Sequence, residues 1–111
     1  MWLTSYDPSG AWPPTEVTLD RPVTIGARAD HAWAHLAAPI TVSGEPRTEV
    51  IIGARHRGWN VWSPAGWPVH VYVCTVGPHL GERTEFTADE VTIAAWGLLH
   101  VSRARAETDE F

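Results

Sequence analysis

Apolar and polar residues alternate along most of this chain with the two-residue period of β-strands. The alternation is clearest at 69–76 (VHVYVCTV), where both faces are fairly apolar, as is typical of a central strand. Further strands are predicted at 16–27, 40–43, 48–55 and 59–62. Pro22 interrupts the first of these, which is therefore either two short strands or one strand with a break at a sheet edge. The short span between 40–43 and 48–55 predicts a hairpin.

The segment 30–38 is ambiguous between helix and strand. Asp30 can cap a short helix that Pro39 ends, and the alanines favour a helix slightly. As a strand, the same segment would place His31 and His35 on one face. Both interpretations stay open at this point.

A second ambiguous segment covers 88–102. Thr87, with Glu90 three residues later, resembles the capping box of a helix. The β-branched run 91–93 and the interior Gly97 oppose a helix. We favour a strand here.

Together these elements predict a mainly β fold, or an α+β fold if an ambiguous segment is helical. We expect a small antiparallel sheet or a partly closed barrel of roughly five to seven strands, with at most one or two short helices. A chain of 111 residues has room for one hydrophobic core. We expect an extended N-terminal arm at 1–15, a single globular domain at 16–102 and a charged C-terminal end at 103–111.

Charge and composition disfavour several classes of function. A net charge of −5 disfavours nonspecific binding to DNA or RNA. No apolar run reaches the roughly 18 residues of a membrane span, and the first residues do not resemble a secretory signal. We therefore expect a cytoplasmic protein, or a virion component if a phage encodes it. Eight arginines without a lysine indicate a GC-rich genome, such as that of an actinobacterium or one of its phages.

Histidines and a single cysteine are the candidate chemical groups. The i, i+4 spacing of His31 and His35 would place two metal ligands on one face of a helix. On a strand they would lie about 13 Å apart, too far for one metal ion. The same spacing separates Cys74 from His70, so we interpret the cysteine as structural. No phosphate loop, serine elbow or dinucleotide motif is present, and we predict no catalytic residue and no cofactor.

The chain has one basic cluster, formed by Arg55 and Arg57. Two arginines beside a glycine turn can hold a phosphate or a carboxylate. On an acidic protein, a solvated hairpin tip explains the same residues.

Tryptophans are concentrated in residues 58–68 (GWNVWSPAGWP). Tryptophan is enriched at the centres of protein–protein interfaces. The candidate partner-binding residues are Trp59, Trp62 and Trp67, with Trp2 and Trp12 of the N-terminal arm. Residues 63–66 fit a type I turn, and on a strand Trp59 and Trp62 would point to opposite faces.

The excess of aromatic surface and the lack of catalytic motifs predict a non-catalytic protein–protein interaction or assembly protein. It could be an accessory subunit, or a phage-type structural or inhibitory subunit. Its partner would be another protein or a second copy of the chain, not nucleic acid and not a membrane. The alternative is a small metal- or ligand-binding enzyme with a histidine-lined barrel mouth.

Overall fold

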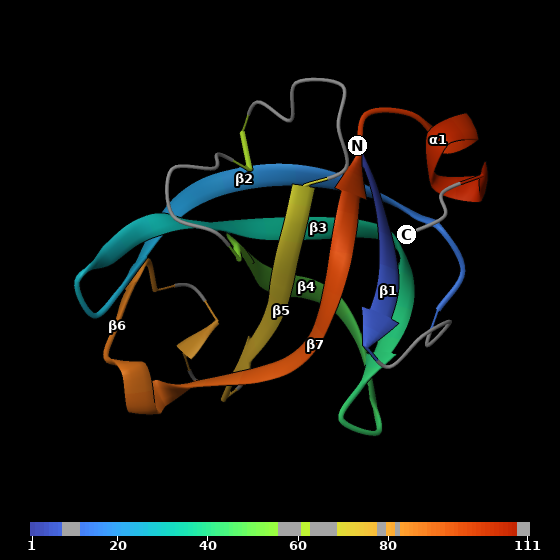
Figure 1. Cartoon of the computed structure of the whole chain (residues 1–111). Helices are drawn as coiled ribbons and strands as arrows, with labels where there is room; N and C mark the ends of the chain where they lie inside the picture. Colours follow the sequence, from blue (N-terminus) through green and yellow to red (C-terminus); the bar gives the residue numbers. More distant parts are fainter. Residues whose placement is uncertain (8–11, 56–60, 63–68, 78–79, 82, 109–111) are drawn as a thin grey trace.

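The computed structural model describes residues 1–7, 12–55, 61–62, 69–77, 80–81 and 83–108 (Figure 1). In chain order its elements are β1 (Trp2–Asp7), β2 (Thr15–Ile25), β3 (Arg28–Val42), β4 (Glu45–Ala54), β5 (Val69–Val76), β6 (Glu85–Phe86), the 3-10 turn η2 (Ala88–Glu90), β7 (Val91–His100) and α1 (Arg103–Thr108). The prediction of a small, mainly β fold is confirmed.

The strands form one seven-stranded sheet in the order β1-β7-β5-β4-β3-β2-β6. All pairs are antiparallel except β2 with β6. An additional pairing of β1 with β2, through Trp2 with Glu16 and Leu3 with Thr15, joins the sheet into a ring that leaves β6 outside. In Figure 1, β2 and β3 cross the view behind β5, β7 and β1.

The main hydrophobic core lies inside this ring, because every ring strand contributes side chains to it. Its buried members are Leu3, Trp12, Val17, Ala32, Ala34, Leu36, Ile40, Val42, Val50, Ile52, Ala54, Val61, Val69, Val71, Val73, Ala95 and Leu99. Along β5, Val69, Val71 and Val73 point inward, whereas Cys74 belongs to a separate cluster on the outer face. The alternation seen in the sequence therefore sorts residues between these two faces.

The slight preference for a helix at 30–38 is wrong, because this segment lies inside strand β3. Ala32 and Ala34 are fully buried in the ring interior, and His31 and Trp33 face the opposite side of the sheet. Small alanines allow close packing at this point, and that tertiary requirement outweighs their helix propensity.

The preference for a strand at 88–102 is confirmed. The capping-box residues Thr87 and Glu90 start one 3-10 turn, η2, and the β-branched run then begins β7. Gly97 of β7 has a packing role, since a Cβ there would collide with the Thr4 carbonyl oxygen of β1. The glycine thus permits the close approach of these two strands.

The interrupted segment 16–27 is one strand as far as Ile25, within β2, whose pairing register with β3 shifts between Leu19 and Pro22. This shift places Val17 in the ring interior and Val23 in the outer cluster. The predicted hairpin between β3 and β4 is also present, and it turns through Ser43 and Gly44 with φ of 52° and 79°.

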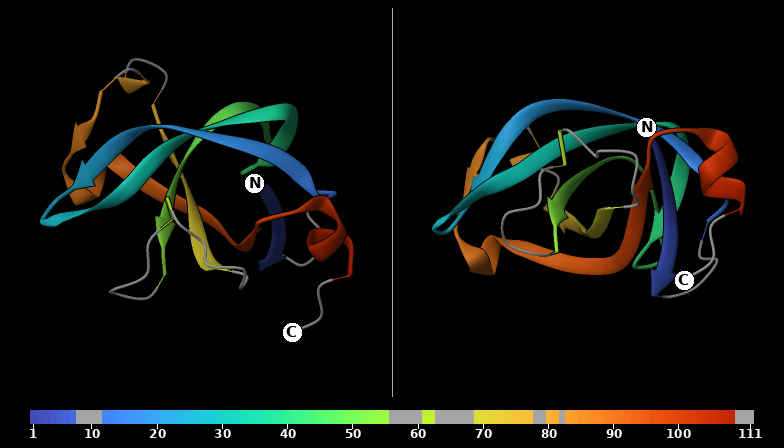
Figure 2. Two further views of the ribbon diagram at one scale, coloured as in Figure 1. Left: turned by 90° about the horizontal axis from the view of Figure 1, so that it is seen from above. Right: turned by 45° about the horizontal axis from the view of Figure 1, so that its top comes forward.

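The structure differs from the sequence-based predictions at 59–62 and in the N-terminal arm. Val61 and Trp62 form a turn instead of the predicted strand 59–62, whose first two residues lie outside the described part of the chain. Within the expected N-terminal arm, residues 2–7 form strand β1 of the sheet. The charged C-terminal end includes the short helix α1, which lies at one end of the ring (Figure 2).

Candidate functional site

The sheet has an outer face, which points away from the interior of the ring. Part of this face is covered by the segment between β5 and β7. We call its described residues, 77, 80–81 and 83–90, the strap. Two contacts attach the strap to the sheet. The indole Nε1 of Trp33 donates to the carbonyl oxygen of Arg83 at 2.7 Å, and β6 pairs with the end of β2. A second cluster of buried side chains lies beneath the strap, formed by Val23, Trp33, Ile51, Cys74, Val76 and Phe86.

A cavity of about 360 Å³ lies between the end of the strap, strand β5 and the turn that joins β2 to β3. We call it the Tyr72 cavity. Its lining residues are Ile25, Arg28, His31, Tyr72, Cys74, Ala88, Val91 and Ile93. Most of this lining is apolar, and Arg28, His31 and Tyr72 supply the hydrogen-bonding groups. Such a mixture of apolar walls and a few convergent polar groups is typical of small-molecule sites.

Arg28, the first residue of β3, is the centre of a hydrogen-bond network. Its Nε and Nη2 donate to the two carboxylate oxygens of Asp30 at 3.1 and 2.5 Å, and Nη2 also donates to the Ala54 carbonyl oxygen at 3.0 Å. Its Nη1 donates to the hydroxyl oxygen of Tyr72. Because this oxygen acts as an acceptor, the hydroxyl proton of Tyr72 remains available to a ligand.

The pair of Arg28 and Asp30 adds polarity to the cavity without adding net charge. Burial alone would raise the pKa of the Asp30 carboxyl, but the hydrogen bonds and charge of Arg28 outweigh burial and lower it. Asp30 is therefore a carboxylate at neutral pH, and it neutralises the guanidinium beside it.

His31 lies against this pair, and its side chain is only 3% exposed. Its Nδ1 is 3.1 Å from Asp30 Oδ1, but the geometry is not that of a hydrogen bond, and Nδ1 has no other partner. Its ring is tilted against that of Tyr72, with centroids 5.5 Å apart. Burial lowers the pKa of His31 despite the opposing charge of Asp30, so the imidazole is neutral at pH 7.

Gly53 allows the two rings to meet. It lies in register between His31 on β3 and Tyr72 on β5. A Cβ at this position would collide with both rings. The missing side chain thus creates the space in which a histidine and a tyrosine from non-adjacent strands touch across β4.

Burial also keeps the two weak acids of the cavity protonated. It raises the pKa of Tyr72 above its usual value, against the charge of Arg28. It raises the pKa of the Cys74 thiol to about 12. At neutral pH the cavity therefore offers a hydroxyl donor, a neutral imidazole and an unreactive thiol.

The two histidines predicted as metal ligands are separated. His31 and His35 lie four residues apart on β3, so their Cα atoms are about 13 Å apart. The side chain of His35 is 44% exposed, and its Nε2 lies 3.1 Å from Asp20 Oδ2. Among the described residues, no group of three or more His, Cys, Asp or Glu side chains is placed to hold a metal ion.

The tryptophans predicted as contact residues occupy different environments. Trp12 is 6% exposed and belongs to the core inside the ring. Trp2 is half-buried, with the Arg103 guanidinium carbon 5.4 Å from its ring centroid. Trp62 is 41% exposed. Trp59 and Trp67 lie outside the described residues.

The predicted basic cluster can be placed only in part. Arg55 is exposed, and its amide donates to the carbonyl oxygen of His70 at 2.8 Å. Arg57 lies outside the described residues. Arg55 is not among the described residues that line the Tyr72 cavity.

Sequence reasoning missed Arg28, Tyr72 and Gly53 as site residues. Alternation along 69–76 did place Tyr72 and Cys74 on one face of the same strand. The partner Arg28, however, is 44 residues away in the chain, and only the folded sheet brings the two together.

Comparisons with known proteins leave the function to be argued from the site itself. The chain matches no family model, no curated protein and no solved structure. Within the described residues, none of the helices has the length and apolar character needed to cross a membrane.

Proposed function

We propose that this protein binds a small molecule in the Tyr72 cavity, and that the ligand is mostly apolar with one hydrogen-bond acceptor. The observation that carries this proposal is the convergence of Arg28, His31 and Tyr72 on an otherwise apolar cavity of about 360 Å³. A cavity of this size accommodates a single substituted ring or a short branched chain.

The hydrogen-bonding groups define the polar end of the ligand. The Tyr72 hydroxyl proton is free to donate, because its oxygen already accepts from Arg28. Asp30 neutralises Arg28, so the site supplies donors without a net positive charge. A neutral carbonyl is therefore the favoured acceptor, and a carboxylate is second.

The same geometry supports binding in preference to catalysis. The thiol of Cys74, with its pKa near 12, is protonated at neutral pH. His31 is neutral, but neither a serine nor a thiolate is hydrogen-bonded to it among the described contacts.

Three ring compounds of similar size test the proposal: benzamide, benzoate and toluene. We expect benzamide to shift the amide NMR signals of residues 72–74 and 91–93, and to bind more tightly than toluene. Tyr72→Phe removes the donor and should weaken benzamide about fivefold while leaving toluene unchanged, since one hydrogen bond contributes about 1 kcal/mol.

Two controls separate the cavity from general effects on the protein. His35→Gln changes an exposed histidine of the same strand and should leave benzamide binding intact. Ala88→Leu, at the exposed rim of the cavity, should weaken all the ring compounds that bind there. Equal binding of benzamide and toluene, or no binding of either, would contradict the proposal.

A second candidate is a protein–protein interaction or assembly function, and the exposure of Trp62 favours it. A tryptophan that is 41% exposed is an unusually large apolar contact for a free surface. The partner would be another protein or a second copy of this chain. Light scattering after size-exclusion chromatography tests self-association. A concentration-dependent dimer that Trp62→Ala abolishes would support this candidate, and a monomer at all concentrations would exclude the homo-oligomer.

A further inference from the structure

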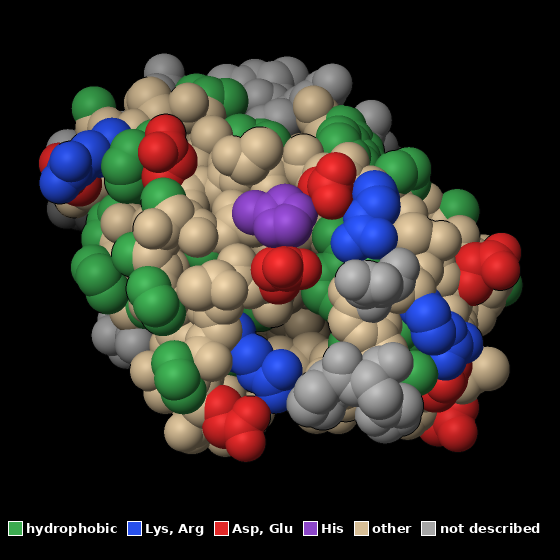
Figure 3. Space-filling view, turned by 180° about the vertical axis from the view of Figure 1, so that it is seen from behind, with side chains coloured by type: hydrophobic (Ala, Val, Ile, Leu, Met, Phe, Trp, Pro, Cys, Tyr) green, Lys and Arg blue, Asp and Glu red, His purple; other side chains and the backbone are tan. Residues whose placement is uncertain are grey.

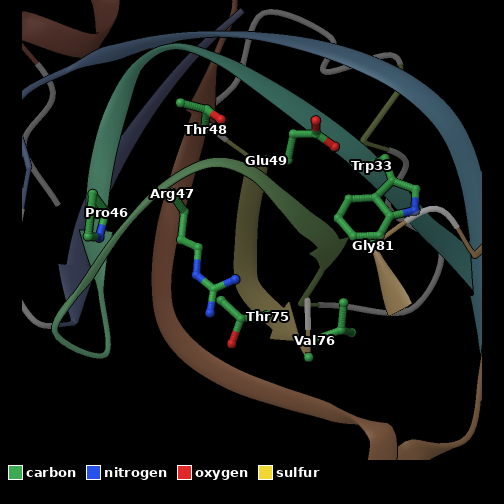
Figure 4. Close-up of a pocket in the computed structure, with 9 residues that line it drawn as sticks. Trp33, Pro46, Arg47, Thr48, Glu49, Thr75, Val76 and Gly81 are labelled. Atoms are coloured by element: carbon green, nitrogen blue, oxygen red, sulfur yellow. The ribbon is translucent and has the colours of Figure 1, made fainter. Parts of the chain in front are cut away.

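A second hollow, of about 400 Å³, lies beside the first residues of the strap (Figures 3 and 4). We call it the Arg47 groove. Its lining residues are Trp33, Pro46, Arg47, Thr48, Glu49, Thr75, Val76, Gly77 and Gly81. Among the described residues it shares no lining residue with the Tyr72 cavity, so this inference does not rest on the proposed function. Figure 3 views a face on which acidic, basic and histidine side chains gather beside a hollow.

Arg47 is the one cationic side chain among the described residues that line this groove. Figure 4 shows its guanidinium directed away from its own strand and lying beside Thr75. Its Nη2 donates to Glu45 Oε2 at 3.0 Å, while its Nε is buried without a hydrogen-bond partner. A buried donor without an acceptor is unfavourable by about 1–3 kcal/mol.

The carboxylate that Arg47 already contacts is a weak competitor for a ligand. Glu45 lies two residues away on the same strand, and its side chain is 68% exposed. An exposed pair of this kind contributes little, because water solvates both groups and salt screens them. A ligand carboxylate inside the groove would be better shielded and could also accept from the Thr75 hydroxyl.

The remaining walls restrict what such a ligand can be. Val76, Pro46 and Trp33 also line the groove and supply apolar surface for a short alkyl chain. Glu49 carries a second negative charge at the groove, and its Oε1 is 3.9 Å from His35 Nδ1. With Glu45 also nearby, a doubly charged anion would be repelled. We infer that the Arg47 groove binds a small aliphatic monocarboxylate, with its carboxylate at Arg47 and Thr75.

Four probes test this inference by calorimetry or NMR titration of the full chain: pentanoate, pentanamide, glutarate and inorganic phosphate. We expect pentanoate to bind and the neutral isostere pentanamide to bind about tenfold more weakly. A charge-assisted bond contributes more than a neutral one, by roughly the free energy that a tenfold change represents. Glutarate and phosphate should also bind more weakly than pentanoate, and Glu49→Gln should improve glutarate.

Matched variants keep the result interpretable. Arg47→Gln should weaken pentanoate about tenfold or more, whereas Arg103→Gln removes another arginine bonded to an exposed glutamate and should have no effect. Thr75→Val should weaken pentanoate severalfold. Thr92→Val changes the residue paired with Thr75 across β5 and β7, outside the groove, and should not. Urea unfolding of each variant shows whether a loss of binding is a loss of fold.

Several outcomes would overturn the inference. Equal affinity for pentanoate and pentanamide would remove the role of charge, and equal affinity for phosphate would remove the selectivity for a monocarboxylate. Unchanged pentanoate binding in a folded Arg47→Gln protein, or no binding of any probe to the unmodified chain, would show that Arg47 has only a structural role.

Discussion

The interior of the ring and the outer face beneath the strap are built from neighbouring residues of the same strands, yet they differ in composition. Ile52 and Ile51 are adjacent on β4 and both are fully buried, the first inside the ring and the second under the strap. The interior cluster is almost purely aliphatic, whereas the outer face also carries His31, Tyr72 and Cys74.

This difference follows from how each face is covered. Six strands surround the interior, so a polar side chain buried there would lose its hydrogen bonds to water. The part of the outer face that carries the second cluster is partly covered by the strap, and hollows lie beside both ends of the strap. Polar groups can be retained there because neighbouring side chains and water can hydrogen-bond to them, as Arg28 does with Tyr72.

The largest expected effect compares the two isoleucines directly. Ile52→Ala should lower the free energy of unfolding by about 4 kcal/mol, because strands on all sides hold the cavity open. Ile51→Ala should lower the free energy of unfolding by about 2 kcal/mol, because the strap can move inward and fill part of the cavity that the substitution leaves. Urea unfolding measures both variants. Equal losses would mean that the strap is as rigid as the ring.

Gly97→Ala tests the contact that helps to close the ring. The new Cβ would collide with the backbone of Thr4, so β1 must move away from β7, at a cost of about 3 kcal/mol. Gly26→Ala is the control, because nothing lies within 4 Å of the Cβ that this substitution would add. Its φ of 60° is unfavourable for alanine, so the free energy of unfolding should fall by only about 1 kcal/mol. A Gly97→Ala protein as stable as the control would show that β1 contributes little to the ring.

The outer face should make stability depend on pH through His31. Burial lowers its pKa in the folded protein below the usual 6.5, so the unfolded chain binds the proton more readily. The stability that the neutral imidazole contributes is complete above about pH 6.5 and declines as the pH falls towards the lowered pKa. Urea unfolding between pH 8 and pH 5 should show a smaller decline in His31→Gln than in the unmodified protein. An unchanged decline would contradict this account, and His35→Gln should keep it.

Cys74 provides the smallest and most local test. Its pKa is raised from 9.0 to about 12, so the folded state favours the thiol, and this contribution is lost as the pH rises from about 9 towards 12. At pH 8 a disulfide reagent should modify the native protein very slowly and the urea-unfolded protein rapidly. Rapid modification without denaturant would show that the strap opens often.

The sequence predicted some parts of this structure better than others. Alternation at 69–76 correctly described a central strand, and the β-branched residues correctly favoured a strand after Glu90. The alanines at 30–38 favoured a helix wrongly. Helix propensity is a local property, whereas the tight interior that requires small residues here is formed by tertiary packing. The spacing of His31 from His35 predicts a shared metal site, but the neighbours of His31 in the structure are Tyr72 and Asp30.

The sequence by itself therefore determined the class of fold and which residues share a face of each strand, because a period of two is a property of the local backbone. Only the tertiary structure decided which faces turn inward, and that β1 joins β2 and β7 to close the ring. It also decided the site. Arg28 contacts Tyr72, and the absence of a side chain at Gly53 leaves space for the rings of His31 and Tyr72. Both arrangements depend on the pairing of strands that are distant in the chain, which no local pattern encodes.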